Sequence, residues 1–249
     1  MKTALVTGGS RGLGRSMALH LAAKGYNVVL TYKSAEAQAE EVVGAVRALG
    51  RDAAALRLDT ADAGRFAPFA EALETVLGGW RQASLDLLVN NAGIGINAPM
   101  AETTPEQFDT LVDIHVKGPF FLTQTLLPIL KDGGAIVNVS TGLTRFCLPG
   151  FGAYAMMKGA VEVMTRYLAA ELGGRGITVN TIAPGAIETD FGQGAVRDNA
   201  EANAFVASHT ALGRAGLPED VGGALAALVS QECRWMNAQR IEVSGGMFL

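Results

Sequence analysis

Short apolar runs alternate along this chain with longer segments whose apolar residues recur at a helical period. The runs cover residues 4–7, 28–31, 53–58, 85–90, 135–140, 178–182 and 240–243. The helix-period segments cover residues 14–24, 35–49, 65–77, 105–130, 154–172 and 218–230. Runs that are apolar on both faces are typical of parallel strands covered by helices on two sides. The alternation therefore predicts an α/β fold with one doubly wound parallel sheet of about seven strands and helices on both faces.

Domain organisation follows from the same pattern. No linker or low-complexity tract interrupts the chain, so residues 1–249 are expected to form one domain. The longest stretch without clear periodicity is 183–210. A long irregular segment in a compact α/β chain is usually either a lid or disordered, and we expect a lid at about residues 186–210.

Composition narrows the classes of function. Hydrophobic residues make up 49% and charged residues 18%, which excludes a disordered chain. No apolar run approaches the roughly 18 residues of a membrane span, so no membrane partner is expected. A net charge of −4 argues against bulk nucleic-acid binding. Cys147 and Cys233 are too few for a disulfide framework and lack metal-ligand spacing, so we expect a cytoplasmic protein without a metal site.

A glycine-rich turn links the first predicted strand to the first predicted helix. Its sequence is Thr7-Gly8-Gly9-Ser10-Arg11-Gly12-Leu13-Gly14. Glycine permits both a tight turn and the close approach of a diphosphate, and a new helix offers that anion unpaired N–H groups. A glycine-rich loop can also merely connect two elements, but its position between a strand and a helix favours nucleotide binding.

The glycine spacing is G-x3-G-x-G, and it resembles the turn of the short-chain dehydrogenase/reductase family. Three further blocks match that family in order: Asn90-Asn91-Ala92-Gly93, Tyr154-x3-Lys158 and Pro184-Gly185. The resemblance covers essentially the whole chain. It implies a Rossmann fold, a single dinucleotide-binding catalytic domain, and a nicotinamide-dependent oxidoreductase resembling the 3-oxoacyl-thioester reductases.

The end of the second predicted strand indicates which nicotinamide cofactor is bound. This strand ends in Tyr32, Lys33 and Ser34, with no acidic residue before Glu36. A carboxylate there would bind the ribose 2′-hydroxyl and repel a 2′-phosphate, whereas cations favour the phosphate. Together with Arg11 this favours NADP(H) over NAD(H), although both cations could be ordinary solvated charges.

The resemblance implies the remaining cofactor contacts. Asp59 would accept from the adenine amino group with Thr60 beside it, and Asn91, Ala92 and Gly93 would line the adenosine ribose. Further contacts would come from the glycine turn (Gly8, Ser10, Arg11, Gly12, Leu13, Gly14), from Pro184 and Gly185, and from Ile187 and Thr189 near the nicotinamide amide.

Tyr154 and Lys158 are four residues apart, so they share one face of a predicted helix. Reduction of a ketone leaves an oxyanion that needs a proton, and a neighbouring ammonium would lower the pKa of a tyrosine toward working pH. By the resemblance, Lys158 would also orient the nicotinamide ribose. The same spacing taken alone also fits an exposed helix face.

The family holds the substrate oxygen with a serine that usually lies 13 positions before the tyrosine. Here that position is Thr141, and Ser140 lies one position earlier. A threonine hydroxyl donates the same hydrogen bond. Thr141 is therefore assigned this role, with Ser140 as the alternative.

His115 stands where the family has an asparagine that connects the lysine to solvent through a water. It could keep this role through its backbone carbonyl, or carry protons itself near a pKa of about 6.5. Equally, it could be a histidine packed between helices.

The substrate is expected to be a small-molecule carbonyl or alcohol. Apolar residues dominate 143–151, while Arg145 leaves room for an acidic tail or an acyl-carrier partner. The apolar C-terminus, residues 243–249, is expected at a subunit interface, which by the resemblance predicts a homotetramer. Two alternatives remain: a catalytically altered NADP(H)-binding or sensing protein of the same fold, and another nicotinamide chemistry such as epimerisation, for which no residues remain to build a substrate domain.

Overall fold

The computed structural model describes residues 1–249 and has one seven-stranded parallel sheet in the order β3-β2-β1-β4-β5-β6-β7. The strands are β1 (Lys2–Val6), β2 (Tyr26–Tyr32), β3 (Ala53–Arg57), β4 (Leu85–Asn90), β5 (Leu130–Val139), β6 (Thr178–Pro184) and β7 (Arg240–Val243). All neighbouring strands pair in parallel. This confirms the predicted doubly wound α/β fold.

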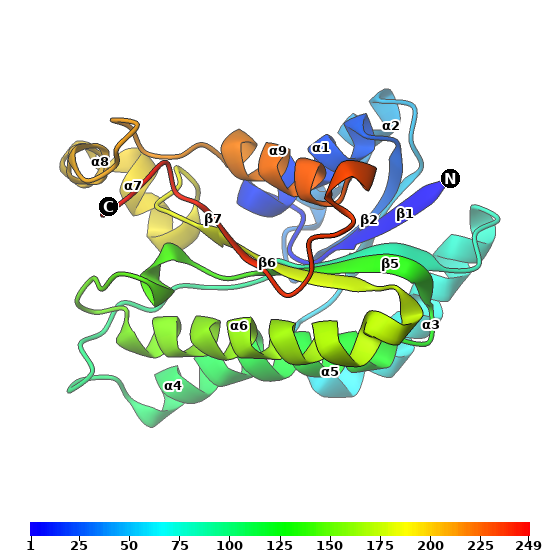
Figure 1. Cartoon of the computed structure of the whole chain (residues 1–249), viewed down its shortest axis with the longest axis horizontal. Helices are drawn as coiled ribbons and strands as arrows, with labels where there is room; N and C mark the ends of the chain where they lie inside the picture. Colours follow the sequence, from blue (N-terminus) through cyan, green and yellow to red (C-terminus); the bar gives the residue numbers. More distant parts are fainter.

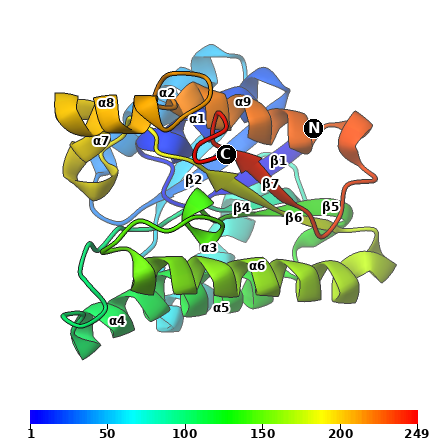
Figure 2. The same cartoon turned by 60° about the vertical axis from the view of Figure 1, so that its left-hand side comes forward.

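Helices cover both faces of the sheet (Figures 1 and 2). On one face lie α1 (Gly12–Ala23), α2 (Glu36–Ala48) and α9 (Pro218–Leu228). The other face carries α3 (Phe66–Gly79), α4 (Pro105–Val112), α5 (Gly118–Leu126) and α6 (Gly152–Leu172). Neighbouring residues of one strand serve both layers: Val6 belongs to the core beside α1, and Leu5 to the core beside α3. Because side chains alternate along a strand, a strand buried on both faces needs the continuous apolar run seen in the sequence.

The strand order reverses beside β1, and this positions the functional site. The chain moves from β1 outward to β2 and β3, then returns to place β4 on the other side of β1. Connections that leave in opposite directions open a crevice at the carboxyl ends of the two central strands. The glycine turn follows β1 and the Asn90–Gly93 block follows β4, so both predicted blocks flank this crevice.

The helix expected over residues 105–130 is interrupted, which corrects the prediction. α4 ends at Val112, a π-helical turn η2 (Asp113–Lys117) follows, and α5 ends at Leu126. Gly118 explains part of this path, because a Cβ there would lie 2.4 Å from the Thr60 carbonyl oxygen. Single π-helical turns frequently occur at functional sites, and this one carries His115.

Residues 183–210 are more regular than expected. Beyond β6 they form the short helix η5 (Phe191–Gly194), then α7 (Ala195–Asp198) and α8 (Ala200–Ser208). The side chain of Asn199 caps α8 by accepting from the N–H groups of Glu201 and Ala202. Part of the segment predicted to be irregular is therefore helical, and α7 and α8 lie next to each other (Figure 2); its role as a lid stays a prediction.

None of the helices combines the length and the apolar character that crossing a membrane requires. No group of three or more His, Cys, Asp and Glu side chains is arranged to hold a metal ion.

Candidate active site

The glycine turn forms a concave backbone surface, here called the cradle, and three of its positions require glycine. Gly8 and Gly12 have φ angles of 64° and 54°, in the left-handed region that favours glycine. A Cβ on Gly14 would lie 2.2 Å from the Gly8 carbonyl oxygen, so the turn and α1 touch at backbone distance. The N-terminal N–H groups of α1 open into this cradle, and no acidic side chain occupies its first turn. The site therefore fits the diphosphate of a dinucleotide.

Asn91 holds the cradle in place. Its Nδ2 donates to the carbonyl oxygens of Thr7 and Gly8 at 2.8 and 3.2 Å. The Thr7 hydroxyl in turn accepts from the backbone N–H groups of Asn91 and Ala92 at 2.9 and 3.0 Å. The Asn91 side chain thus joins β1 to β4, and contact of Asn91, Ala92 and Gly93 with a ribose stays a prediction.

Cations gather beyond the ends of β2 and β3. Lys33 Nζ lies 2.6 Å from Asp59 Oδ2, and the Arg57 guanidinium donates to the Lys33 carbonyl oxygen at 3.2 Å. Burial opposes the effect, but Lys33 and the Ala61 N–H hold the pKa of Asp59 below its usual value. Sequence reasoning missed Arg57, which is brought here by pairing of β3 with β2, register Tyr32–Arg57.

The remaining predicted cofactor residues lie around the same crevice. Ser10 and Leu13 belong to the glycine turn, and Thr60 directly follows Asp59. Tyr32 ends β2, and Ser34 follows it at an exposed position. Arg11 reaches from the turn to the lid, where its Nε lies 3.6 Å from Asp190.

Pro184, Gly185, Ile187 and Thr189 lead from β6 into the lid. A Cβ on Gly185 would lie 2.9 Å from Ser244, and Ile187 forms a parallel bridge with Gly216. Gly12 lies near Thr189, because a Cβ there would be 3.6 Å from the threonine side chain. Thr189, at the start of the predicted lid, therefore lies beside the glycine turn.

Tyr154 and Lys158 lie buried in the first turns of α6, with 6% and 5% of their surfaces exposed. The Lys158 ammonium donates to the Val139 carbonyl oxygen at 2.8 Å and lies 5.7 Å from the centroid of the Tyr154 ring. Burial lowers the pKa of Lys158 to about 8.

Burial raises the pKa of Tyr154 above its usual value, and the Thr141 hydroxyl opposes this rise. The expectation that Lys158 lowers the tyrosine pKa is therefore not met in the free protein, because desolvation dominates and the ammonium is directed to a backbone carbonyl.

Thr141 and Ser140 point to different partners. The hydroxyl of Thr141 interacts with Tyr154, and the same oxygen accepts from the Leu143 N–H at 3.3 Å. The Ser140 hydroxyl instead donates to Glu162 Oε1 at 2.6 Å. The structure thus brings Thr141, and not Ser140, to the phenol.

His115 is 1% exposed and contacts the tyrosine ring edge-on, with ring centroids 5.3 Å apart and planes at 81°. Its Nε2 lies 2.8 Å from the Ile94 carbonyl oxygen, while its Nδ1 has no hydrogen-bond partner. Burial, with a smaller contribution from the Lys158 charge, lowers the pKa of His115 to about 3. The ring is neutral near pH 7, as expected of a histidine packed between helices.

The lid places an aromatic ring over the tyrosine. Phe191 lies with its centroid 5.7 Å from that of Tyr154, and a Cβ on Gly95 would come within 2.7 Å of Phe191. Sequence reasoning missed Phe191, because only the path of the lid brings it to α6.

Arg145 is not the free cation that the sequence suggested. Its guanidinium makes two bonds to the Glu242 carboxylate, at 2.6 and 2.8 Å, and donates to the carbonyl oxygens of Met247 and Phe248. Glu242 lies on β7 and the other two residues on the C-terminal segment, so this arginine ties the loop that follows β5 to the C-terminal segment.

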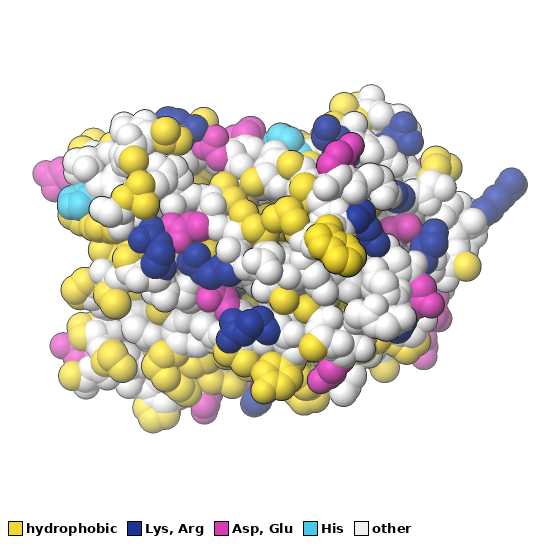
Figure 3. Space-filling model, viewed as in Figure 1, with side chains coloured by type: hydrophobic (Ala, Val, Ile, Leu, Met, Phe, Trp, Pro, Cys, Tyr) yellow, Lys and Arg dark blue, Asp and Glu magenta, His cyan; other side chains and the backbone are white.

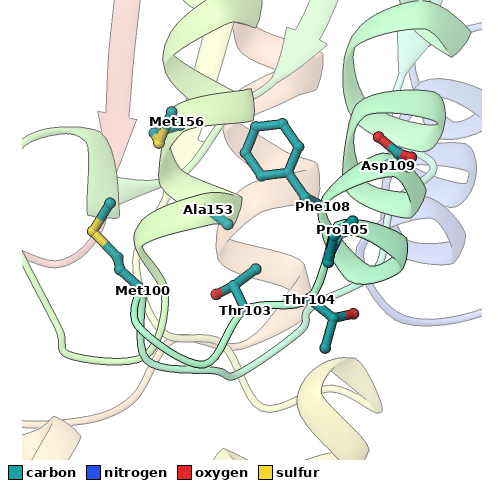
Figure 4. Close-up of a pocket in the computed structure, with 8 residues that line it drawn as sticks. All are labelled: Met100, Thr103, Thr104, Pro105, Phe108, Asp109, Ala153 and Met156. Carbon is teal, nitrogen blue, oxygen red and sulfur yellow. The ribbon is translucent and has the colours of Figure 1, made fainter.

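A separate cavity of about 400 Å³ lies on the outer side of the first turn of α6 (Figure 4). Its lining residues are Met100, Thr103, Thr104, Pro105, Phe108, Asp109, Ala153 and Met156. Ala153 and Met156 face this cavity, whereas Tyr154 belongs to the buried cluster with Leu111 and Met157. Phe108 and Ala153 line the cavity and also pack against this cluster, so the cavity lies next to the buried surroundings of Tyr154.

Comparison with known proteins decides the family. The family model described as enoyl-(acyl carrier protein) reductase matches residues 8–248. The chain belongs to the short-chain dehydrogenase/reductase family. The match spans the glycine turn, the Tyr154–Lys158 pair and residues 186–210, whose roles stay predictions.

Individual proteins that are similar to this chain support its assignment to the short-chain dehydrogenase/reductase family. A 3-oxoacyl-(acyl-carrier-protein) reductase FabG of Staphylococcus aureus is 36% identical over 250 residues, which span 100% of this chain and 98% of the relative. The promiscuous reductase LugOII, which catalyses keto-reduction at C1 during lugdunomycin biosynthesis, superposes with a TM-score of 0.94 at 38% identity over 100% of this chain and 98% of that chain. The angucycline C-6 ketoreductase LanV with bound NADP has a TM-score of 0.93 at 36% identity, with coverages of 99% and 95%.

Proposed function

We propose that this oxidoreductase interconverts a ketone or 3-oxoacyl carbonyl and the corresponding alcohol with NADP(H), with Tyr154 as general acid and base. The observation that carries the proposal is the buried Tyr154 phenol beside the Thr141 hydroxyl, on the helix face that also bears Lys158. Residues 1–249 act in this proposal as one catalytic domain, with a lid at about residues 186–210.

Each side chain has a distinct task. NADPH, when bound along the crevice, supplies the hydride that reduces the carbonyl carbon. The Thr141 hydroxyl donates to the carbonyl oxygen, and Tyr154 transfers its phenolic proton to that oxygen as negative charge develops. The Lys158 ammonium, which donates to the Val139 carbonyl oxygen, is placed to bind the nicotinamide ribose and orient it beside Tyr154. In the reverse direction the phenolate accepts the alcohol proton.

His115 serves as a neutral support in this scheme. Its Nε2 is engaged by Ile94, and its ring edge packs on Tyr154, so it fixes the orientation of the phenol. A ring with a pKa of about 3 carries almost no proton near pH 7, which argues against its acting as a relay.

NADP(H) is favoured over NAD(H) because Lys33 and Arg57 lie together at the end of the crevice where the 2′-phosphate would lie, whereas Arg11 is directed to Asp190. Asp59 is already paired with Lys33, which reduces its repulsion of a phosphate. NADP bound to the similar angucycline ketoreductase supports the assignment. Isothermal titration should show NADP⁺ binding more tightly than NAD⁺; the opposite order would overturn this preference.

The proposed substrate class is a small to medium apolar carbonyl compound, either free or linked to an acyl carrier. Leu143 and Phe151 beside Tyr154 are apolar, and the similar FabG is named for acyl-carrier substrates. Since Arg145 is held by Glu242, it does not contribute a free cation for an acidic carrier.

Assembly as a homotetramer is also proposed. Exposed apolar side chains gather on α5 and α6, and Figure 3 shows apolar patches along the edge formed by α4 and α6. They are Phe120, Phe121, Met156, Val163 and Tyr167. A monomer rarely leaves such a group of large apolar residues uncovered. The cytoplasmic location stays a prediction.

A screen of NADPH oxidation tests the proposed activity. The panel should hold aromatic and aliphatic ketones, sugar and steroid ketones, and 3-oxoacyl thioesters. Turnover of at least one class is expected. Tight NADPH binding without turnover of any carbonyl would instead favour the catalytically altered binding or sensing protein.

A further inference from the structure

We propose that Glu162 is a positioning residue, which together with Arg240 and Thr144 fixes the strand end that presents Thr141 to Tyr154. This inference rests on the proposed reductase activity but concerns residues outside the matched family blocks. Glu162 lies four residues after Lys158 and eight after Tyr154, so all three share one face of α6.

One carboxylate oxygen of Glu162 gathers three donors. Its Oε1 accepts from the Ser140 hydroxyl at 2.6 Å, from the Thr144 hydroxyl at 2.7 Å and from Arg240 Nε at 2.8 Å. These donors come from the end of β5, from the short helix η3 (Gly142–Thr144) and from β7. Glu162 thereby links α6 to a residue before Thr141 (Ser140) and to a residue after it (Thr144).

Arg240 completes the contact with Thr141 itself. Its Nη2 donates to the Thr141 carbonyl oxygen at 3.1 Å, and the Thr144 hydroxyl lies 3.0 Å from the same oxygen. The backbone of Thr141 is extended, and the tight turn of η3 begins directly after it. Fixing this carbonyl restrains the peptide unit from which the Thr141 side chain points toward the phenol.

Partial burial strengthens the electrostatic attraction between Glu162 and Arg240. The side chains of Glu162 and Arg240 are 15% and 25% exposed, so water screens their attraction less than that of a surface pair. Arg240 also contacts Glu242 at 2.9 Å, and Glu242 holds Arg145. In the view of Figure 3, basic and acidic side chains alternate across the surface between β7 and α6.

The chemistry gives this arrangement a purpose. A substrate oxygen must receive the Thr141 hydrogen bond and the Tyr154 proton together, and small misplacements of such groups cost large factors in rate. A carboxylate that bonds neighbours of Thr141 on both sides and stands on the helix of Tyr154 fixes the distance between the two hydroxyls. Glu162 itself does not touch the substrate.

A double-mutant cycle tests the proposal. Glu162→Ala should lower kcat roughly 10-fold, because Glu162 acts only through the placement of the Thr141 hydroxyl relative to Tyr154. The KM for NADPH should stay within about twofold, because Glu162 does not contact the cofactor. In a Thr141→Ala background, the same change should lower kcat by no more than about twofold. Glu162→Gln keeps a carbonyl oxygen for the three donors, so it should retain most of the activity. An additive cycle, or an unchanged kcat in Glu162→Ala, would overturn the proposal.

A second readout does not depend on activity. Backbone hydrogen exchange over residues 140–150 should be faster in Glu162→Ala than in the wild type, and close to wild type in Glu162→Gln. If Glu162→Ala does not fold, Thr144→Val replaces it, because this isosteric change removes one of the three donors to Glu162. Exchange over residues 140–150 should again be faster than in the wild type. Unchanged exchange in these variants would refute the positioning role, whereas faster exchange in a protein without turnover would refute only the proposed reductase function.

Asp86→Ala is the matched control. The Asp86 side chain is also 15% exposed and carries one charge, but it lies at the start of β4, where it accepts from the Thr3 N–H at 2.8 Å. Loss of this carboxylate should leave both kcat and exchange over residues 140–150 unchanged. A matching loss of kcat in Asp86→Ala would show that lowered stability, and not positioning, explains the effect of Glu162→Ala.

Discussion

At the scale of single residues, burial controls protonation in the reaction centre. Tyr154, Lys158 and His115 are each almost fully buried, and in each case burial disfavours the charged form. The phenol keeps its proton, which suits a donor, and the imidazole is neutral. Only Lys158 titrates near working pH.

The pH dependence of reduction should therefore report Lys158. Its ammonium is present below pH 8 and is lost as the pH rises through about 8, while Tyr154 stays protonated. Because kcat/KM reports groups of the free enzyme, log kcat/KM should fall above pH 8 with a slope approaching about −1. A profile that stays flat to about pH 10 would show that this ammonium is not required.

His115 should make the fold sensitive to acid. Its pKa is about 3 in the native state and about 6.5 when unfolded, so below pH 6.5 only the unfolded state binds the proton. Stability is then lost as the pH falls, by about 2 kcal/mol between pH 7.5 and 5. Denaturant unfolding should show a smaller loss over this range in His115→Asn. Parallel stability curves for the two proteins would contradict the buried, neutral histidine.

At the scale of elements, the parts that depend on local pattern were predictable and the parts that depend on tertiary contact were not. The apolar runs located the central strands, because a strand buried on both faces must be apolar throughout, and β7 was located although its sequence RIEV holds two charged residues and is only half-buried. The interruption at Asp113–Lys117 was missed, since the close approach of Gly118 to Thr60 requires the folded structure. The helix α8 was missed because its sequence, AEANAFVAS, lacks one continuous apolar face.

In the candidate site, too, residues related by local spacing were predictable and residues joined by tertiary contact were not. The spacing that pairs Tyr154 with Lys158 continues to Glu162, and this signal was present in the sequence. Arg240, however, comes 78 residues after Glu162 and reaches it only because β7 pairs with β6. Spacing along one helix can therefore propose a shared face, but not the partner from a distant strand.

The glycine turn offers a test of element geometry. Gly14→Ala would place a Cβ about 2.2 Å from a backbone oxygen, so the turn and α1 must separate. We expect NADPH affinity to fall at least roughly 10-fold and unfolding free energy to fall by about 1–3 kcal/mol. Gly44→Ala is the control, because nothing lies within 4 Å of its added Cβ in α2. It should stabilise the protein by about 0.5–1 kcal/mol and leave NADPH binding unchanged. Equal affinities for the two variants in isothermal titration would contradict the cradle.

At the scale of the whole molecule, the exposed apolar faces of α5 and α6 predict the proposed homotetramer. Tyr167 on α6 is 67% exposed, and Val163 one turn earlier is 44% exposed. Tyr167→Glu should disrupt the proposed tetramer, which sedimentation velocity at micromolar concentration would detect as smaller species. Leu49→Glu changes a residue of similar character, 48% exposed, at the end of α2 on the other face of the sheet, and should leave the mass unchanged. A wild-type monomer would refute the assembly.

The most direct measurement of the whole account compares wild type and Tyr154→Phe in NADPH oxidation with a substrate found by the carbonyl screen, alongside NADPH titrations of both proteins. Removing one hydroxyl deletes the proton donor but keeps the ring that packs on His115 and Phe191. We predict that kcat falls at least roughly 100-fold while NADPH affinity changes less than about threefold. Turnover by Tyr154→Phe at a rate close to wild type would contradict the assignment of Tyr154 as the acid.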